Sequence, residues 1–290
     1  MTISINLIYG YTGQLSLGHA AFLGIGAYSF TLLTVNVGLN FWLAFIIAII
    51  IVGITAALVG YPAFRLKGAY FILVTLGFAI IIHVVLLAWV DLTGGANGIR
   101  NIPRPPEIPL PFGTTISFKS ALSIYYLILF FLILILFINS RLIKSLVGKT
   151  FIAISWNEDL AQSLGINTTR NKVLSFTISA MFAAVAGILY ATYNSVISPG
   201  LAHFTEGVFP IVYLVVGGVG TMAGPIIGTM VLVVVPEILQ SVLLLKTLSY
   251  GVILLLFVIF LPSGIVGNVK LLLAKVKRTR ESSRRKYGIT

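Results

Sequence analysis

Long apolar runs separated by short polar breaks are the feature that most restricts the fold of this chain. A helix needs about 20 apolar residues to cross the hydrocarbon core of a membrane, and in lipid it must satisfy its backbone groups internally. Only 9% of the 290 residues are charged, whereas soluble domains carry about 25%. The sequence therefore predicts an all-α, polytopic transmembrane bundle, with clear spans at about 20–37, 41–61, 69–90, 121–139 and 173–194.

The remaining apolar stretches predict broken or re-entrant helices. Residues 208–242 are too many for one span and carry a glycine cluster at their centre. We expect two segments there, about 208–219 and 224–242, joined by a glycine turn, and the first either crosses fully or turns back. A final span is expected at about 247–262. Residues 3–9 are too few to span, so they either continue a helix or lie at the membrane interface. The total is about eight membrane segments.

Basic residues predict the orientation of these segments. The net charge is +12, and fifteen of the nineteen Lys and Arg residues lie in the loop around Arg65 and Lys67, in segment 140–172 and in tail 270–290. The positive-inside rule makes these three places cytoplasmic, so residues 91–120 form an external loop. We therefore expect a permease domain at 1–269 and a basic cytoplasmic tail at 270–290. Because the positions of the basic residues are explained by membrane orientation, the positive net charge gives no reason to expect a nucleic-acid partner.

Segment 140–172 contains a short predicted helix at 155–165. Ser155 and Glu158 fit a capping box, in which the two side chains satisfy each other's backbone amides at a helix start. Gly165 stands where a left-handed C-cap is expected. A two-turn helix is marginal by itself, so it either docks on a partner or is a surface helix only. The residues predicted to seat it on a partner are Ser155, Glu158, Asp159, Leu160, Ala161, Leu164 and Gly165.

Polar and glycine residues within the predicted spans are candidates for a translocation path. An ionisable residue inside a membrane is a functional hypothesis by default, although neutral histidine is also the cheapest such residue to bury. The polar groups of 13–19 either line a path or pair with backbone freed by the neighbouring glycines, and we favour pairing. Thr93 to Asn97 predict a tight loop at the outer mouth. The candidates are Gly13, Gln14, Ser16, Gly18, His19, His83, Thr93, Asn97, Gly217, Gly218 and Gly220.

Several chemistries lack the residues they need. The chain has no cysteine, three histidines and seven scattered acidic residues, which leaves little material for a metal site and none for a disulfide. The sequence contains no Walker motif, paired carboxylates or nucleophile beside a base. We therefore expect a non-catalytic transport subunit that needs no cofactor. Small residues at Gly24, Ala27, Ala183, Ala184 and Gly187 predict close helix packing in lipid.

The segment Gly13-Gln14-Leu15-Ser16-Leu17-Gly18-His19-Ala20-Ala21-Phe22 resembles the membrane subunits of bacterial branched-chain amino acid importers of the ABC class, the LivM type. The resemblance continues at Tyr70–Phe78, Leu92–Ile99, Asn157–Ile166 and Val215–Gly228. It implies a multi-pass protein of a bacterial or archaeal cytoplasmic membrane, with a cytoplasmic C-terminus. It also implies a further spanning segment before Gly13, so the start is expected to be truncated or mis-assigned.

The resemblance implies partners as well. These are a second related permease subunit, two cytoplasmic ABC ATPases and an extracytoplasmic substrate-binding protein, around a chain embedded in the lipid bilayer. Residues 157–166 match the EAA loop, whose helix sits in a cleft of the ATPase, although Asp159-Leu160-Ala161 departs from a literal Glu-Ala-Ala. A urea or short-amide importer shares the same signature and is the nearest alternative. A stand-alone secondary transporter usually carries midmembrane charges, which these spans lack, and a membrane-embedded enzyme is weaker still.

Overall fold

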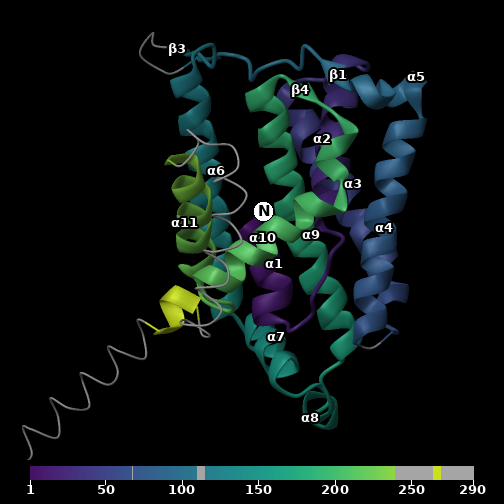
Figure 1. Cartoon of the computed structure of the whole chain (residues 1–290), viewed down its shortest axis with the longest axis vertical. Coiled ribbons are helices and arrows are strands. Elements are labelled where there is room, and N and C mark those ends of the chain that lie inside the picture. The colour runs from purple at the N-terminus through teal and green to yellow at the C-terminus, as the bar shows by residue number, and fades with distance from the viewer. Residues whose placement is uncertain (67, 110–114, 239–263, 269–290) are drawn as a thin grey trace, which may run out of the picture. The chain divides into compact units, whose positions relative to one another are not determined.

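The computed structural model describes residues 1–66, 68–109, 115–238 and 264–268, and the predicted span at 247–262 and tail at 270–290 lie outside them. Regular structure in this part of the chain is mostly helical, with four two-residue strands (Figure 1). The elements are α1 (Thr2–Ile5), η1 (Asn6–Tyr11), α2 (His19–Val35), α3 (Phe41–Ala63), α4 (Ala69–Ala88), α5 (Val90–Thr93), η2 (Gly95–Asn97), β1 (Ile99–Arg100), β2 (Ile108–Pro109), β3 (Thr115–Ile116), α6 (Ala121–Lys144), α7 (Leu146–Trp156), α8 (Glu158–Ser163), α9 (Thr168–Asn194), β4 (Val196–Ile197), η3 (Pro199–Ala202), α10 (Phe204–Gly217) and α11 (Gly224–Ile238).

Helix length confirms four of the predicted spans. In the described residues, α3, α4, α6 and α9 are long and apolar enough to cross a membrane. The predicted span at 20–37 is helix α2, whose 17 residues reach about 26 Å at 1.5 Å per residue. That length falls a little short of the roughly 30 Å hydrocarbon core. The chain is therefore an all-α, multi-pass membrane protein that combines full-length spans with shorter apolar helices.

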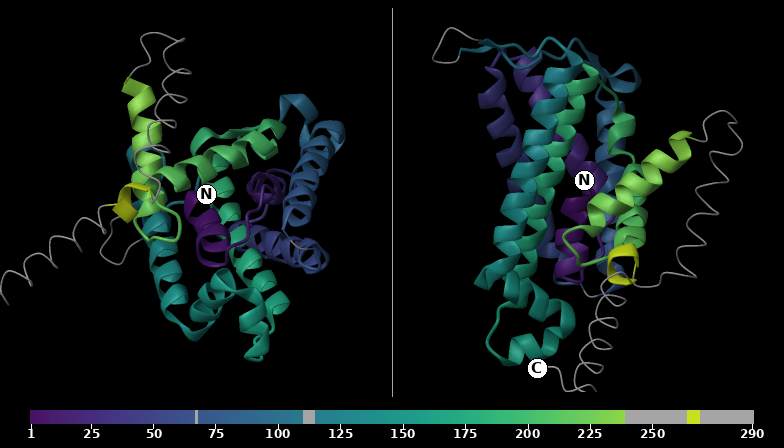
Figure 2. Two further views of the ribbon diagram at one scale, coloured as in Figure 1. Left: turned by 60° about the horizontal axis from the view of Figure 1, so that its bottom comes forward. Right: turned by 90° about the vertical axis from the view of Figure 1, so that its left-hand side faces the viewer.

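The chain divides into two units, the first holding Met1 with residues 3–209 and the second holding Thr2 with residues 210–290. In the first unit α2, α3 and α9 pack side by side (Figures 1 and 2). α9 is the central helix: 61% of its most apolar 18-residue window is buried, against 17% for α6. Buried aromatic residues, among them Phe22, Phe64, Phe71 and Phe176, fill the space beside it. The weakly buried α6 leaves most of its surface for lipid or another protein.

Small residues bring α2 and α9 into backbone contact, as the sequence predicts. A Cβ atom built at Gly187 would lie 2.1 Å from the carbonyl oxygen of Leu23, and one at Gly26 would lie 2.6 Å from the Cα atom of Ala184. No side chain fits at either distance. Association in lipid depends on close packing of this kind, so these glycines set the position of α2 against α9.

The N-terminal residues form a helix that, from Ile3 onward, belongs to the first unit. α1 and η1 run from Thr2 to Tyr11, and the side chains of Ile5, Leu7 and Ile8 are fully buried. A helix lying at the membrane interface would expose one face, so the interfacial alternative for residues 3–9 is wrong. The chain then runs without regular structure from residue 12 to residue 18 and enters α2 at His19.

The second unit contains the predicted glycine turn. α10 ends at Gly217, α11 begins at Gly224, and Gly218 and Gly220 have φ values of 120° and 70°. A Cβ atom at Gly228 would lie 1.9 Å from the carbonyl oxygen of Tyr213. The two helices therefore pack backbone to backbone after the turn. The 14 residues of α10 reach about 21 Å, which is shorter than a full span.

Candidate functional site

The segment between α6 and α9 is more helical than the sequence predicts. α6 continues to Lys144, and α7 occupies residues 146–156, where no helix was expected before 155. Ser145 caps α7 by accepting a hydrogen bond from the Gly148 amide at 3.3 Å. A Cβ atom at Gly148 would lie 2.3 Å from the carbonyl oxygen of Leu142. The chain therefore turns sharply from α6 into α7 at a position that only glycine tolerates.

The predicted capping box at Ser155 is wrong. Ser155 lies inside α7, and α8 begins at Glu158 with Asn157 as its N-cap. The Oδ1 atom of Asn157 accepts a hydrogen bond from the Leu160 amide at 2.9 Å, with the Asn157 backbone extended. Asn and Ser are about equally good N-caps, so the choice of Asn157 over Ser155 depends on where α7 ends. The carboxylate of Glu158 therefore has no role in a capping box and pairs with Lys172.

The predicted left-handed end of α8 is confirmed. Gly165 has a φ of 84°. The Gly165 amide donates to the carbonyl of Gln162 at 2.9 Å, and the Ile166 amide donates to the carbonyl of Ala161 at 3.1 Å. This pair of bonds is the Schellman motif, which satisfies the last carbonyls of a helix. α8 is therefore a defined two-turn element with both ends capped.

The apolar residues of α8 differ in how far they are exposed. Ala161 is buried, whereas Leu160 and Leu164 are 59% and 75% exposed. Trp156 at the end of α7 is 86% exposed, so the two leucines continue an apolar surface that starts on α7. Between the two helices lies a cavity of about 390 Å³. It is lined by Lys149, Ile152, Ala153, Trp156, Asn157, Leu160, Ala161 and Leu164.

Sequence reasoning missed the contribution of α7 to this surface. Ile152, Trp156, Leu160 and Leu164 follow one another at intervals of four residues, a spacing that places residues on one helix face. That periodicity was the available signal, and it continues across the break at Asn157. We call the exposed side chains of Trp156, Leu160 and Leu164, with the cavity they border, the α7–α8 groove.

Sequence reasoning also missed an ion pair between α8 and α9. The Nζ atom of Lys172 lies 2.6 Å from Oε2 of Glu158, and their side chains are 6% and 29% exposed. Removing one partner of a buried ion pair typically costs about 3–5 kcal/mol, and the partial exposure of Glu158 places this pair toward the lower end. Asp159, the other acidic residue of the first turn, is exposed.

The glycine-rich segment before α2 contacts α7. Gly13 has a φ of 74°, and a Cβ atom there would lie 3.1 Å from the Cα atom of Ser155. The Gly13 and Gln14 amides donate to the carbonyls of Tyr9 and Ile8 at 3.1 and 3.0 Å. The segment thus closes the end of the N-terminal helix and touches the C-terminal part of α7.

Two of the three polar path candidates in this segment are engaged inside the protein. The fully buried Ser16 hydroxyl accepts a hydrogen bond from the Gly18 amide at 3.2 Å. His19 is also fully buried, and its Nε2 atom lies 2.6 Å from the Ser179 hydroxyl. Gln14 is half-buried. Ser16 therefore pairs with backbone freed by a glycine, as we favoured, and His19 pairs with a side chain of α9.

At the opposite end of α9, a second glycine turn joins the loop after α4 to the bundle. The buried Thr93 hydroxyl lies 2.6 Å from the carbonyl oxygen of Leu86 and accepts from the Gly95 amide at 3.2 Å. β1 pairs antiparallel with β4, directly after α9. A Cβ atom at Gly98 would lie 1.8 Å from the carbonyl oxygen of Ile197. The predicted tight turn is confirmed, with Asn97 exposed on it, and its location at the outer mouth stays a prediction.

His83 sits beside this end of the first unit. Its Nδ1 atom lies 2.9 Å from the carbonyl oxygen of Pro199, and its ring packs edge-on against His203 with 5.0 Å between centroids. The histidine has a backbone partner and an aromatic neighbour. Its half-buried position is therefore explained by local packing. In the described residues, no three His, Cys, Asp or Glu side chains gather as metal ligands.

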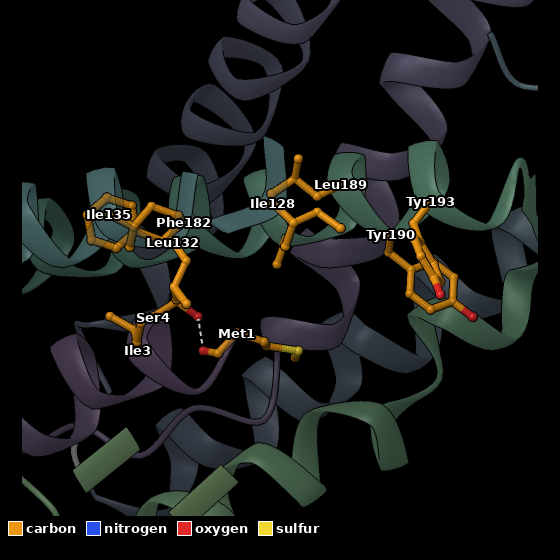
Figure 3. Close-up of a pocket in the computed structure, with 11 residues that line it drawn as sticks. Met1, Ile3, Ser4, Ile128, Leu132, Ile135, Phe182, Leu189, Tyr190 and Tyr193 are labelled. Atoms are coloured by element: carbon orange, nitrogen blue, oxygen red, sulfur yellow. Dashed lines mark hydrogen bonds between the residues drawn. The ribbon is translucent and has the colours of Figure 1, made fainter. Parts of the chain in front are cut away.

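Three cavities among the described residues were compared with the predicted path residues. Besides the cavity of the α7–α8 groove, one of about 320 Å³ lies between the N-terminal helix, α6 and α9 and is mainly apolar (Figure 3). Another, of about 380 Å³, lies between the end of α9 and the start of α10 and includes Asn194 and Glu206. None of the path candidates lines any of these three cavities.

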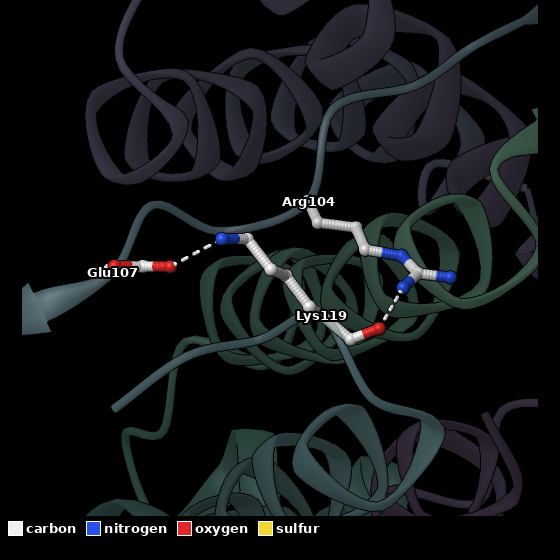
Figure 4. A network of polar contacts seen from close by, with 3 residues as sticks. All are labelled: Arg104, Glu107 and Lys119. Atoms are coloured by element: carbon white, nitrogen blue, oxygen red, sulfur yellow. Dashed lines mark hydrogen bonds and ion pairs between the residues drawn. The ribbon is translucent and has the colours of Figure 1, made fainter. Parts of the chain in front are cut away.

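A small polar network orders the proline-rich loop between β1 and α6. Lys119 Nζ lies 2.8 Å from Glu107 Oε1, and Arg104 donates to the carbonyl of Lys119 (Figure 4). The ammonium group lowers the pKa of Glu107 by hydrogen bonding and charge attraction, and the carboxylate raises the pKa of Lys119. The stabilisation that this ion pair gives to the folded loop is therefore lost as the pH falls through the lowered pKa of Glu107. Both groups are solvent-exposed, so the contribution is small and screened by salt.

Comparisons with known proteins agree with the resemblance. A family model described as "Branched-chain amino acid transport system / permease component" matches residues 1–261. The permease protein LivM of Escherichia coli K12 is 34% identical over 91% of this chain and 66% of LivM. LivH of Salmonella typhimurium is 29% identical over 92% of this chain and 90% of LivH. The chain thus spans slightly less than two thirds of the length of that LivM. No solved structure gives a significant match.

The corrected cap of α8 is testable with two alanine variants. Asn157→Ala removes the side chain that accepts the Leu160 amide, and losing an N-cap typically costs about 1 kcal/mol. Ser155→Ala is the matched control, because an exposed hydroxyl inside α7 caps nothing, and we expect a change within about 0.5 kcal/mol. Hydrogen exchange at the amides of residues 158–164 reports the difference. Faster exchange in Ser155→Ala than in Asn157→Ala would show that Ser155 is the N-cap, as the capping-box prediction had it.

Proposed function

The chain belongs to the family of permease components of branched-chain amino acid transport systems, and from this we propose that it is the membrane-spanning subunit of an ATP-driven importer of leucine, isoleucine and valine. The observation that carries the proposal is the match over residues 1–261. LivM and LivH, whose names state branched-chain amino acid transport, support the same substrate class. ATP hydrolysis belongs to partner chains, and this subunit supplies the path and the coupling surface.

The geometry supports the coupling part of the proposal through the α7–α8 groove. Trp156, Leu160 and Leu164 expose large apolar side chains at one end of the bundle. They continue without a break into the groove's apolar cavity. Contiguous exposed apolar surface of this kind marks interaction sites. We propose that a cytoplasmic ATPase inserts an apolar side chain into this groove.

The remaining assembly follows from the same proposal. The partners are a second related permease subunit, two cytoplasmic ATPases and an extracytoplasmic binding protein. Among the four long apolar helices of the described residues, α6 is the least buried, which suits a face against lipid or the second permease subunit. The outer loop, closed on the end of α9 by β1 and β4, suits contact with the binding protein.

We propose that the α7–α8 end of the first unit is cytoplasmic. Arg141 and Lys144 lie in the last turn of α6, and Arg170 and Lys172 lie in the first turns of α9, so four basic residues flank this end. A cytoplasmic C-terminus follows if the final span and the basic tail, which lie outside the described residues, behave as their sequence predicts. With α10 as a re-entrant helix or a short span, the total is about eight membrane segments.

The translocation path is proposed to use backbone groups more than side chains. Broken helices expose backbone dipoles to small polar substrates at membrane depth. Two such breaks in the described part of the chain are residues 12–18 and the turn at Gly217, Gly218 and Gly220. Few charges occur in the spans, which suits a cargo with an apolar side chain and a zwitterionic head met by these dipoles.

Uptake by the complete complex in proteoliposomes tests the substrate. We expect ATP-dependent accumulation of labelled leucine that excess isoleucine or valine abolishes and excess urea leaves unchanged, because the apolar side chain is the shared feature. Omitting ATP from the vesicles is the control. ATP-dependent uptake of labelled urea that is insensitive to leucine would replace this proposal with the urea and short-amide alternative.

Orientation is testable by cysteine labelling, because the natural chain contains no cysteine. Lys149→Cys places a thiol on exposed α7, and Asn97→Cys places one on the exposed outer loop. An impermeant maleimide added to intact cells should label position 97 only, and permeabilised cells should label both. Labelling of position 149 in intact cells would invert the orientation.

A further inference from the structure

Helix α8 is bonded to the start of α9 by a set of side chains on its inner face. Glu158 pairs with Lys172, and the Gln162 amide donates to the hydroxyl of Thr168 at 2.9 Å. Glu158 and Gln162 lie four residues apart, so the two share one helix face. The opposite face carries the apolar side chains of the α7–α8 groove. α8 is thus bonded to α9 through one face, and its other face is exposed for contact with a partner protein.

Lys172 is the strongest of these attachments. Lysine is almost never fully buried unless it is paired, and this residue is 5% exposed. Its ammonium group therefore depends on the Glu158 carboxylate, 2.6 Å away. Any displacement of α8 must carry Lys172 with it or leave a buried charge without its partner. The neighbouring Asp159, being exposed, is the carboxylate that remains available to another protein.

The same face of α9 holds the broken N-terminal segment. Ser175 lies 2.6 Å from the Thr12 hydroxyl. Ser179 lies 2.6 Å from Nε2 of His19 and donates to the carbonyl of Ser4 at 2.5 Å. Lys172, Ser175 and Ser179 are spaced three and four residues apart, so they form one stripe along the helix. Each contacts an element outside α9, and all of these contacts belong to the first unit.

We propose that Lys172 is a positioning residue of the transport cycle. Through Glu158 it ties α8 to the polar stripe of α9, so that movement of α8 reaches the glycine-rich segment 12–18 as well as the body of α9. Glu158 then acts within this chain, and the partner ATPase is gripped by the apolar face and Asp159. This inference rests on the proposed function, because it assigns the route by which ATP hydrolysis in a partner moves the permease.

A charge exchange distinguishes this internal link from direct contact of Glu158 with an ATPase. Lys172→Met, Glu158→Gln and the exchanged pair Glu158→Lys/Lys172→Glu are compared in the complete complex in proteoliposomes. Arg170→Gln is the matched control, since it removes an exposed positive charge two residues from Lys172. Copurification of the ATPases measures assembly, and leucine imported per ATP hydrolysed measures coupling.

Both single variants should retain the ATPases and lose coupling by roughly 5- to 150-fold, the usual range for energetic coupling between sites. The exchanged pair should recover most of the loss, and Arg170→Gln should match the unmodified complex. A merely structural pair would lower the yield of folded complex without changing leucine imported per ATP.

Several results would overturn the link. One is unchanged coupling in Lys172→Met. Another is an exchanged pair that assembles but transports no better than the single variants, because Glu158 would then interact with a positive charge on the ATPase and not with Lys172. If the Lys172→Met complex does not assemble, leucine imported per ATP by the exchanged pair is compared with that of Glu158→Gln alone, and no improvement contradicts the link. An unmodified complex without ATP-dependent leucine uptake contradicts the proposed function instead, which keeps the two failures apart.

Discussion

Buried polar groups in a membrane bundle must find their partners inside the protein, because lipid offers none. The polar stripe of α9 follows from this constraint. Lys172, Ser175 and Ser179 are all buried, and each meets a group from a different element, namely α8, the segment after η1, and the start of α2. Polar residues on a central helix therefore decide which elements are fastened to it.

Close packing makes these bonds possible. Gly26 and Gly187 let the backbones of α2 and α9 touch, and this contact brings His19 within hydrogen-bond distance of Ser179. A larger side chain at either glycine would push α2 away and break the hydrogen bond between His19 and Ser179, leaving Ser179 with its bond to the Ser4 carbonyl. At the far end, Gly98 allows β1 to approach β4 in the same manner. Small residues thus set the geometry, and polar residues join the elements at the contacts the glycines create.

Local patterns in the sequence predict much of this architecture. Apolar length locates α3, α4, α6 and α9, and Gly165 correctly marks the end of α8. The start of α8 was misplaced because Ser155 and Asn157 are both acceptable N-caps, and only the three-dimensional path of α7 selects between them. The partner of Glu158 is fourteen residues away along the chain, across a turn, so no local pattern indicates it. The path candidates were chosen by residue type alone, and the described cavities do not gather them.

The account requires α8 and α9 to move as one body when the partner ATPases bind and release nucleotide. Spin labels at Ser163→Cys on α8 and Tyr193→Cys near the C-terminal end of α9, on the naturally cysteine-free chain, measure the distance between them by electron double resonance in the complete complex. We predict the same distance distribution in the nucleotide-free and ATP-trapped complexes. A 163–193 distance that changes between the two complexes would show that α8 moves independently of α9 and would contradict the account.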